Sequence, residues 1–369
     1  MRGSLGALTA LALLTAPAAA LDAVVTPRAA TARDFVFVSG EVIPELRLGF
    51  ETYGTLDATG ENAVLVSPFF AGDCHAAGKR DPAEPEAGWW DALIGPGLAI
   101  DTRRSFVVCT EVLSSNRVKD PSVVTTGPAT VDPRTGQRYD LTFPRTTIRD
   151  LVRAQGAVLE ALGVRRLQAV VGPSLGGMLA LAWAVEEPAR VERAIAVAAP
   201  LQFSDRERQA LRNAAATVRG DPAWCLGDYA RYGVEPLLGM AMALRGWSAI
   251  VAGRGAWLPW LLPGYLAEAG RFEANHYLYM LDLHAGYELT GPYSTPDAAF
   301  RRVRAEVTLI GFDDDRFVTP TELRAGRDAL RVAGVRADLE VVAGTHGHLS
   351  ALYDLDALAP ALRRALARP

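Results

Sequence analysis

The chain has 369 residues, of which half are hydrophobic and 22% are charged, and its formal net charge is −4. This composition is that of an ordinary globular protein and argues against long disordered segments. Lysine and arginine are scattered along the chain, which excludes the basic stripe or patch of a nucleic-acid-binding surface, so we expect a small-molecule substrate.

The first twenty residues have the pattern of a secretory signal peptide. Arg2 supplies a positive charge, residues 5–14 are mostly apolar, and the alanines at 18–20 match an A-x-A cleavage site. The apolar run is too short to span a bilayer, and no later stretch is long and apolar enough to do so. We therefore expect residues 1–20 to be removed before Leu21, leaving a secreted or periplasmic protein with no membrane association.

The cysteines and histidines do not predict a metal site. Cys74, Cys109 and Cys225 allow at most one disulfide, and which two would pair is open. No two of them have zinc-ligand spacing, and the five histidines form no H-E-x-x-H motif. We expect neither a metal ion nor a bound cofactor.

Short apolar, β-prone runs alternate with longer segments of helical periodicity. The predicted strands are residues 63–66, 105–109, 167–171, 194–199, 307–310 and 338–342. The predicted helices are residues 147–162 and 177–186, which end before Gly163 and Pro188. This alternation predicts an α/β fold, with a mostly parallel sheet flanked by helices on both faces.

The alternation stops between residues 201 and 303. This segment is helix-prone and rich in Leu, Ala, Tyr and Trp, including Trp224, Trp247, Trp257 and Trp260. In open α/β sheets, ligands bind beyond the carboxyl ends of the strands, where an insertion would cover them. We predict a core of residues 21–200 and 304–369 with a helical cap, or lid, at 201–303. The alternative is a helical lobe that only enlarges the core.

The sequence GPSLGG, at residues 172–177, follows an apolar strand and begins an apolar helix. Its G-x-S-x-G form is typical of a nucleophilic serine on a tight strand-to-helix turn, where small neighbours let the backbone close. The motif alone is weak in a glycine-rich chain, and its strand–turn–helix context gives it weight. The position at a helix N-terminus also favours developing negative charge. We predict that Ser174 is a nucleophile.

A nucleophilic serine needs a histidine base and an acid that orients it. Asp313, Asp314 and Asp315 follow one predicted strand, and His346 and His348 follow the next. An aspartate run after a strand is often turn chemistry, and a loop histidine is often solvated. The order Ser, Asp, His is nevertheless that of the α/β-hydrolase fold, so we predict a catalytic triad, with the choice within each group open.

The oxyanion hole of such an enzyme uses two backbone N–H groups. One is that of Leu175, directly after the nucleophile. The other is expected in the SPFFAGDCH loop after the strand at 63–66, where we choose Phe70. Phe70 could equally form a wall of the substrate pocket.

The chain resembles the homoserine O-acetyltransferase family of α/β hydrolases from about Phe50 to Leu362. The matching stretches are ETYGTL (51–56), AGDCHAAG (71–78), GWWDALIGPGLAIDT (88–102), FPRTTIRDLVRAQ (143–155), GPSLGGMLALAWA (172–184), RFEANHYLY (271–279), DDDRFVTP (313–320) and the Gly-His pair at 347–348. The resemblance implies a seryl-enzyme that passes an acyl group from a coenzyme A thioester to a small hydroxy amino acid. It selects Asp315 and His348 for the triad, and it implies a possible homodimer formed through the cap.

Three departures from the family pattern concern the acceptor. The family's Asp after the catalytic His is Leu349 here, and a cap-helix Arg that would clamp a carboxylate aligns with Leu244, one position before Arg245. One residue along a helix turns a side chain by about 100°, which would weaken a bidentate carboxylate contact. The family's Gly-rich segment after Cys109 is replaced by SSNRVKDPSVV. Arg245 and Tyr277 are the predicted substrate contacts.

We therefore predict an acyl-transfer enzyme that uses acyl-CoA or another acyl ester as donor and an alcohol as acceptor, without a preference for homoserine. One alternative is a secreted carboxylic-ester hydrolase, in which water takes the acyl group. The other is a non-catalytic binding protein on the same fold, since a fold alone does not decide function.

Overall fold

The computed structural model describes residues 21, 24–251, 262–291 and 293–367, so the expected signal peptide, Trp257 and Trp260 lie outside it. Its centre is an eight-stranded sheet with the order β1-β2-β6-β3-β7-β8-β9-β10. The six strands from β6 to β10 in this order are parallel, whereas β2 is antiparallel to both β1 and β6. The strands of this sheet are β1 (Arg28–Val36), β2 (Val42–Tyr53), β3 (Ala63–Val66), β6 (Phe106–Thr110), β7 (Leu167–Pro173), β8 (Arg193–Val197), β9 (Glu306–Phe312) and β10 (Ala337–Val342).

All six predicted strands are present, and their ends differ from the prediction by at most two residues. Strands β1 and β2, which form an antiparallel hairpin at one edge of the sheet, were not predicted from the sequence. Most side chains of β1 are exposed, and Pro44 and several charged residues interrupt the apolar pattern of β2. The hairpin therefore has no continuous apolar run of the kind that marks a buried parallel strand.

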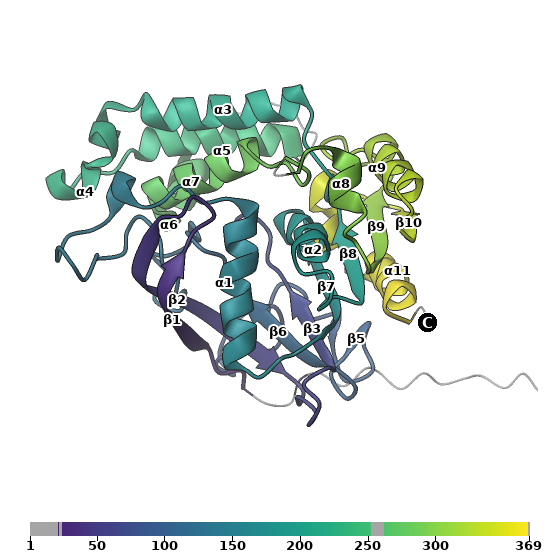
Figure 1. Ribbon diagram of the computed structural model, residues 1–369. Helices are drawn as coiled ribbons and strands as arrows, with labels where there is room; N and C mark the ends of the chain where they lie inside the picture. The colour runs from purple at the N-terminus through teal and green to yellow at the C-terminus, as the bar shows by residue number, and fades with distance from the viewer. Residues whose placement is uncertain (1–20, 22–23, 252–261, 292, 368–369) are drawn as a thin grey trace, which may run out of the picture.

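Helices cover both faces of the sheet. Helices α1 (Ile148–Ala161) and α2 (Leu175–Glu186) share one hydrophobic core with one face, and α11 (Leu355–Ala367) packs on the other. In Figure 1, α1 lies in front of the sheet and α11 beside its far edge. A capping box of Thr147 and Asp150 begins α1, and Gly163, with φ +77°, follows its end. The predicted α/β-hydrolase architecture, with a mostly parallel sheet and flanking helices, is confirmed.

The described residues between β8 and β9 form helices and no strand. They are α3 (Asp205–Arg219), a 3₁₀ segment (Pro222–Gly227), α4 (Tyr229–Tyr232), α5 (Leu237–Val251), α6 (Leu262–Arg271), α7 (Ala274–Ala285) and α8 (Pro296–Phe300). Figure 1 shows α3, α5 and α7 lying together above the sheet. This is the position that a cap over the strand ends would occupy, while the exact domain limits remain a prediction. Two short strands, β4 (Ile94–Gly95) and β5 (Ile100–Asp101), form a separate two-stranded sheet. The remaining helices, α9 (Pro320–Val332) and α10 (Ser350–Tyr353), follow β9 and β10 in the chain.

Within the described ranges, no helix combines the length and the apolar character needed to cross a membrane. The same residues hold no cluster of His, Cys, Asp and Glu side chains with the arrangement of a metal site. Cys74, Cys109 and Cys225 are all free thiols, so none of the possible disulfides is formed.

Candidate active site

Ser174 occupies the turn between β7 and α2 in a strained backbone conformation, with φ +52° and ψ −111°. A non-glycine residue rarely adopts positive φ, and such strain gathers at functional sites. Two neighbouring glycines permit the turn. A Cβ on Gly172 would lie 2.3 Å from the carbonyl oxygen of Ser67, and one on Gly176 would lie 2.1 Å from the same oxygen. Glycine is therefore the residue that fits at both positions.

Ser174, His348 and Asp315 form a hydrogen-bonded line. The Ser174 Oγ lies 2.9 Å from the Nε2 of His348, whose Nδ1 lies 2.8 Å from the Oδ2 of Asp315. The other Asp315 oxygen accepts hydrogen bonds from the N–H groups of Phe317 and Val318, at 2.8 and 2.9 Å. Because this carboxylate accepts a hydrogen bond from the Nδ1–H group, Nε2 carries the lone pair that faces the serine hydroxyl. The arrangement is suited to removing the serine proton.

The neighbouring aspartates and histidine have other partners. Asp313 and Asp314 accept hydrogen bonds, at 2.9 and 2.7 Å, from backbone N–H groups of the loop that carries His348. His346 is exposed and lies 2.9 Å from Asp354. The structure thus brings Ser174, predicted from its motif, together with Asp315 and His348, which the family resemblance selected, and leaves the alternatives outside the line.

The two predicted oxyanion donors lie on adjoining segments. The N–H of Ser67 donates to the carbonyl of Val171, at 2.9 Å, so the loop that leads to Phe70 runs beside the end of β7. Leu175 is the first residue of α2, and its N–H has no acceptor within the helix. Among the described residues, neither this N–H nor that of Phe70 has a hydrogen-bond acceptor. Both remain available as predicted donors.

Five aromatic side chains, which we call the aromatic collar, contact one another in a closed circuit next to the triad. Its members, in order around the circuit, are Phe70, Trp247, Phe317, Phe203 and His284. The distances between successive ring centroids are 6.4, 5.0, 5.5, 6.4 and 4.9 Å. Phe317 also contacts the ring of His348, at 4.9 Å. Because Trp247 lies on α5 and His284 on α7, the cap supplies part of an apolar surface beside the candidate nucleophile.

The two predicted substrate contacts differ in position. Tyr277 is fully buried, and its ring meets that of Phe70 edge-on at 5.6 Å, so it adjoins the collar. The Arg245 guanidinium lies 3.8 Å from the sulfur of the exposed Met242, whereas Leu244 is buried in the cap. Arg245 is not a member of the Ser174–His348–Asp315 line, and both substrate roles remain predictions.

Sequence reasoning missed the collar members Phe203, Phe317 and His284. The available signals were weak: Phe317 lies two residues after Asp315, and His284 lies seven residues after Tyr277, on the same face of a helix.

The buried carboxylate of Glu111 supports the segment that follows Phe70. Its Oε1 accepts a hydrogen bond from the N–H of Cys74, at 3.0 Å. Burial, with the nearby Asp73 as a second cause, raises the pKa of Glu111 from 4.5 to about 8. The folded protein therefore holds this proton more tightly than the unfolded chain does. The resulting stabilisation is present in full below about pH 4.5 and is lost as the pH rises to about 8.

Replacing Glu111 with glutamine keeps an oxygen for the Cys74 N–H and removes the titration. Between about pH 4.5 and 8, the free energy of unfolding of the wild type should fall relative to that of the variant. The slope should be at most about 1.4 kcal/mol per pH unit, the value for one proton. Urea unfolding at successive pH values measures it. Parallel pH dependence of the two proteins would show that Glu111 does not titrate in this window.

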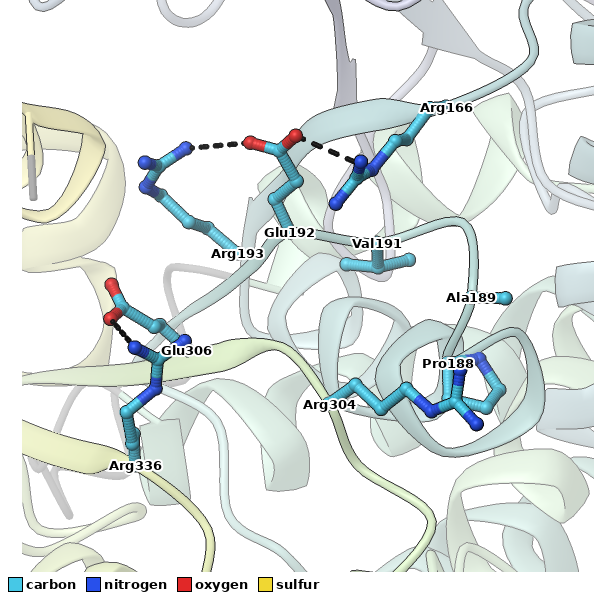
Figure 2. Close-up of a pocket in the computed structure, with 9 residues that line it drawn as sticks. All are labelled: Arg166, Pro188, Ala189, Val191, Glu192, Arg193, Arg304, Glu306 and Arg336. Carbon is cyan, nitrogen blue, oxygen red and sulfur yellow. Dashed lines mark hydrogen bonds and ion pairs between the residues drawn. The ribbon is translucent and has the colours of Figure 1, made fainter. Parts of the chain in front are cut away.

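A pocket of about 380 Å³ lies at the end of the sheet where strands β8 and β9 begin (Figure 2). It contains Arg166, Arg193, Arg304 and Arg336 together with Glu192 and Glu306. Glu192 pairs with two of these arginines and Glu306 with another. The pocket adjoins the first residues of β8 and β9, whereas the triad follows the last residues of strands. It is therefore separate from the candidate active site.

The parallel sheet, the serine on its strained turn and the Ser–His–Asp line define an α/β-hydrolase-fold protein. Residues 125–243 also match the family described as the alpha/beta hydrolase fold. Full-length relatives narrow the assignment. The chain is 34% identical over 358 residues to the homoserine O-acetyltransferase of Geobacter sulfurreducens, covering 91% of this chain and 95% of that one. The chain belongs to the homoserine O-acetyltransferase family.

Two solved structures share the fold closely. Homoserine O-acetyltransferase from Bacillus anthracis has a TM-score of 0.89 and 29% identity, with 94% of this chain and 98% of that one covered. Esterase E22 has a TM-score of 0.86 and 32% identity, with 93% of this chain and 100% of that one covered. A homoserine O-acetyltransferase and an esterase therefore share their architecture with this chain.

Proposed function

We propose that the protein is an acyl-transfer enzyme that works through a covalent acyl–Ser174 intermediate. The hydrogen-bonded line of Ser174, His348 and Asp315 carries this proposal, because it supplies a nucleophile, a base and an orienting acid in order. The strained turn at Ser174 and the membership of an acyltransferase family support it.

In the first half-reaction, His348 Nε2 takes the Ser174 hydroxyl proton as Oγ bonds to the carbonyl carbon of an acyl ester or thioester, such as acyl-CoA. The carbonyl electron pair moves to oxygen, and the N–H groups of Leu175 and Phe70 stabilise the oxyanion. The oxyanion then re-forms the carbonyl and expels the alkoxide or thiolate, which takes the proton from His348. Asp315 stabilises the transient imidazolium throughout.

The second half-reaction repeats these steps with an acceptor hydroxyl in place of Ser174. His348 deprotonates the acceptor as it attacks the acyl-enzyme, and the proton then returns to Ser174 Oγ. Water and alcohols compete for the same intermediate, so transfer requires a site that binds the alcohol and limits water. The aromatic collar beside His348 is suited to both tasks.

We propose an uncharged alcohol rather than homoserine as the acceptor. Leu349 replaces the acid that follows the histidine in related transferases, and the position of their carboxylate clamp holds the buried Leu244. Losing one charged contact costs about 2–5 kcal/mol, a large share of the binding energy of a small amino acid. The collar offers aromatic surface to a neutral acceptor instead.

Ester hydrolysis is the second candidate function. The same acyl-enzyme forms, and water takes the acyl group. The similarity to esterase E22, at 32% identity over nearly the whole chain, favours this candidate.

Partitioning of the acyl-enzyme tests the acceptor. The enzyme is acetylated with p-nitrophenyl acetate, and the ratio of acetate to acetyl ester is measured with increasing 1-butanol or homoserine, with Ser174→Ala as the blank. We expect saturable capture by 1-butanol and little capture by homoserine. Saturable capture by millimolar homoserine would overturn the proposed acceptor, and capture by neither alcohol would assign the protein to the esterases.

A further inference from the structure

Three side chains around Phe70 each carry a buried polar atom without a hydrogen-bond partner in the described chain. These atoms are Asn116 Oδ1, Tyr277 Oη and His284 Nε2. Each of the three residues is at most 2% exposed. The Asn116 amide nitrogen lies 3.1 Å from the Phe70 carbonyl oxygen, and the Tyr277 and His284 rings lie 5.6 and 4.9 Å from the Phe70 ring. The three residues that carry the unpaired atoms therefore all contact Phe70.

The hydrogen-bonding character of each atom follows from its neighbours. His284 Nδ1 donates to the carbonyl of Met280, at 2.7 Å, so Nε2 carries a lone pair. Burial lowers the pKa of His284 to about 4, which keeps the ring neutral near pH 7. The Asn116 amide group donates to Phe70, so its Oδ1 is an acceptor. The Tyr277 hydroxyl can donate and accept. The three side chains thus offer two acceptors and one hydroxyl, none of them charged.

Leaving such atoms unpaired away from water is unfavourable, and buried polar groups in folded proteins nearly always have partners. The buried Tyr287 of the cap follows this rule, because its hydroxyl donates to the carbonyl of Pro200, at 3.3 Å. The exceptions around Phe70 lie beside the predicted oxyanion loop and the collar, where a bound substrate would be found.

We propose that Asn116, Tyr277 and His284 form a subsite that binds an uncharged hydroxyl group on the alcohol portion of the substrate. A hydroxyl donates to one of the acceptors and accepts from a hydroxyl, as the set requires. A carboxylate would face the lone pairs of Asn116 and His284, and an ammonium group would find no opposite charge in the set. The inference rests on the proposed acyl-transfer function and specifies its substrate class.

The test uses binding rather than turnover. In the Ser174→Ala background, calorimetry compares 4-hydroxybutyl acetate with pentyl acetate, which carries a methyl group in place of the hydroxyl. We expect about tenfold tighter binding of the hydroxy ester, the value of one net hydrogen bond. Equal, weaker or undetectable binding of the hydroxy ester would overturn the proposal, because a purely apolar collar would favour the pentyl ester.

Two buried tyrosines provide matched variants. Tyr277→Phe, added to Ser174→Ala, should remove most of the preference for the hydroxy ester without lowering the melting temperature, because the Tyr277 hydroxyl has no hydrogen-bond partner among the described residues. His284→Leu should also remove it. Tyr287→Phe should lower the melting temperature and keep the preference, because its hydroxyl is paired with the carbonyl of Pro200. Loss of the preference in Tyr287→Phe, with the preference kept in Tyr277→Phe, would contradict the proposed subsite.

Binding by the Ser174→Ala protein does not depend on the chemical step. Failure of the proposed function would instead appear as undiminished ester turnover by that variant, so the two failures are distinguishable.

Discussion

Replacing Ser174 with alanine is expected to lower turnover of an activated ester by a factor on the order of 10⁴ or more, as removal of a triad nucleophile does. We expect the variant to keep the turn geometry, because alanine is smaller than serine. The substitution removes only the Oγ atom and its hydrogen bond with His348. Steady-state hydrolysis of p-nitrophenyl acetate measures the effect, and circular dichroism checks the fold.

Substitutions of the other two triad residues should lower turnover to different extents. His348→Ala should be about as severe, since the base is lost. Asp315→Asn should cost less if the imidazole finds another orienting group. His346→Ala is the matched control, because this exposed histidine pairs with Asp354 outside the line. A damaging His346→Ala combined with a mild His348→Ala would contradict the assignment.

The second large effect is expected from Gly176→Ala. The added Cβ would lie 2.1 Å from the backbone carbonyl oxygen of Ser67, which cannot yield as a flexible side chain could. Displacing Ser67 moves the loop that carries Phe70, the predicted second oxyanion donor. Turnover should fall by about 10²–10³, the cost of losing one donor. The free energy of unfolding should fall by about 1–3 kcal/mol, the cost of overpacking.

Gly264→Ala is the matched control for this substitution. Gly264 lies in α6, and a Cβ there meets no atom of the described residues within 4 Å. The change should leave turnover unaltered and slightly raise stability, because alanine is the better helix former. Wild-type turnover by Gly176→Ala would show that the Ser67 loop is not coupled to the chemical step.

The sequence was sufficient for the parts of the fold that have strong local patterns. The strands β3, β7 and β9 are short runs of buried apolar residues, which periodicity identifies well. The G-x-S-x-G turn lies between a strand and a helix, as its motif requires. The choice of Asp315 and His348 within their groups came from the family resemblance, because the residues alone left it open.

Features that depend on tertiary contacts could not be found in this way. The collar joins Phe70 to Trp247 and His284, each of which lies more than a hundred residues after Phe70 in the chain. No local sequence pattern pairs rings so far apart. The unpaired oxygen of Asn116 is equally invisible, because its significance depends on burial and on the absence of a partner. The edge hairpin was missed because exposed strands lack a continuous apolar run.

Mass spectrometry of the intact protein tests the central claim most directly. The wild type is quenched in acid during turnover of p-nitrophenyl acetate, and peptide mapping locates any adduct. We expect one added acetyl group on the peptide that contains Ser174, and none on the corresponding peptide of Ser174→Ala. An acetyl group on another residue with Ser174 unmodified, or equal turnover by the wild type and Ser174→Ala, would contradict the acyl-enzyme mechanism.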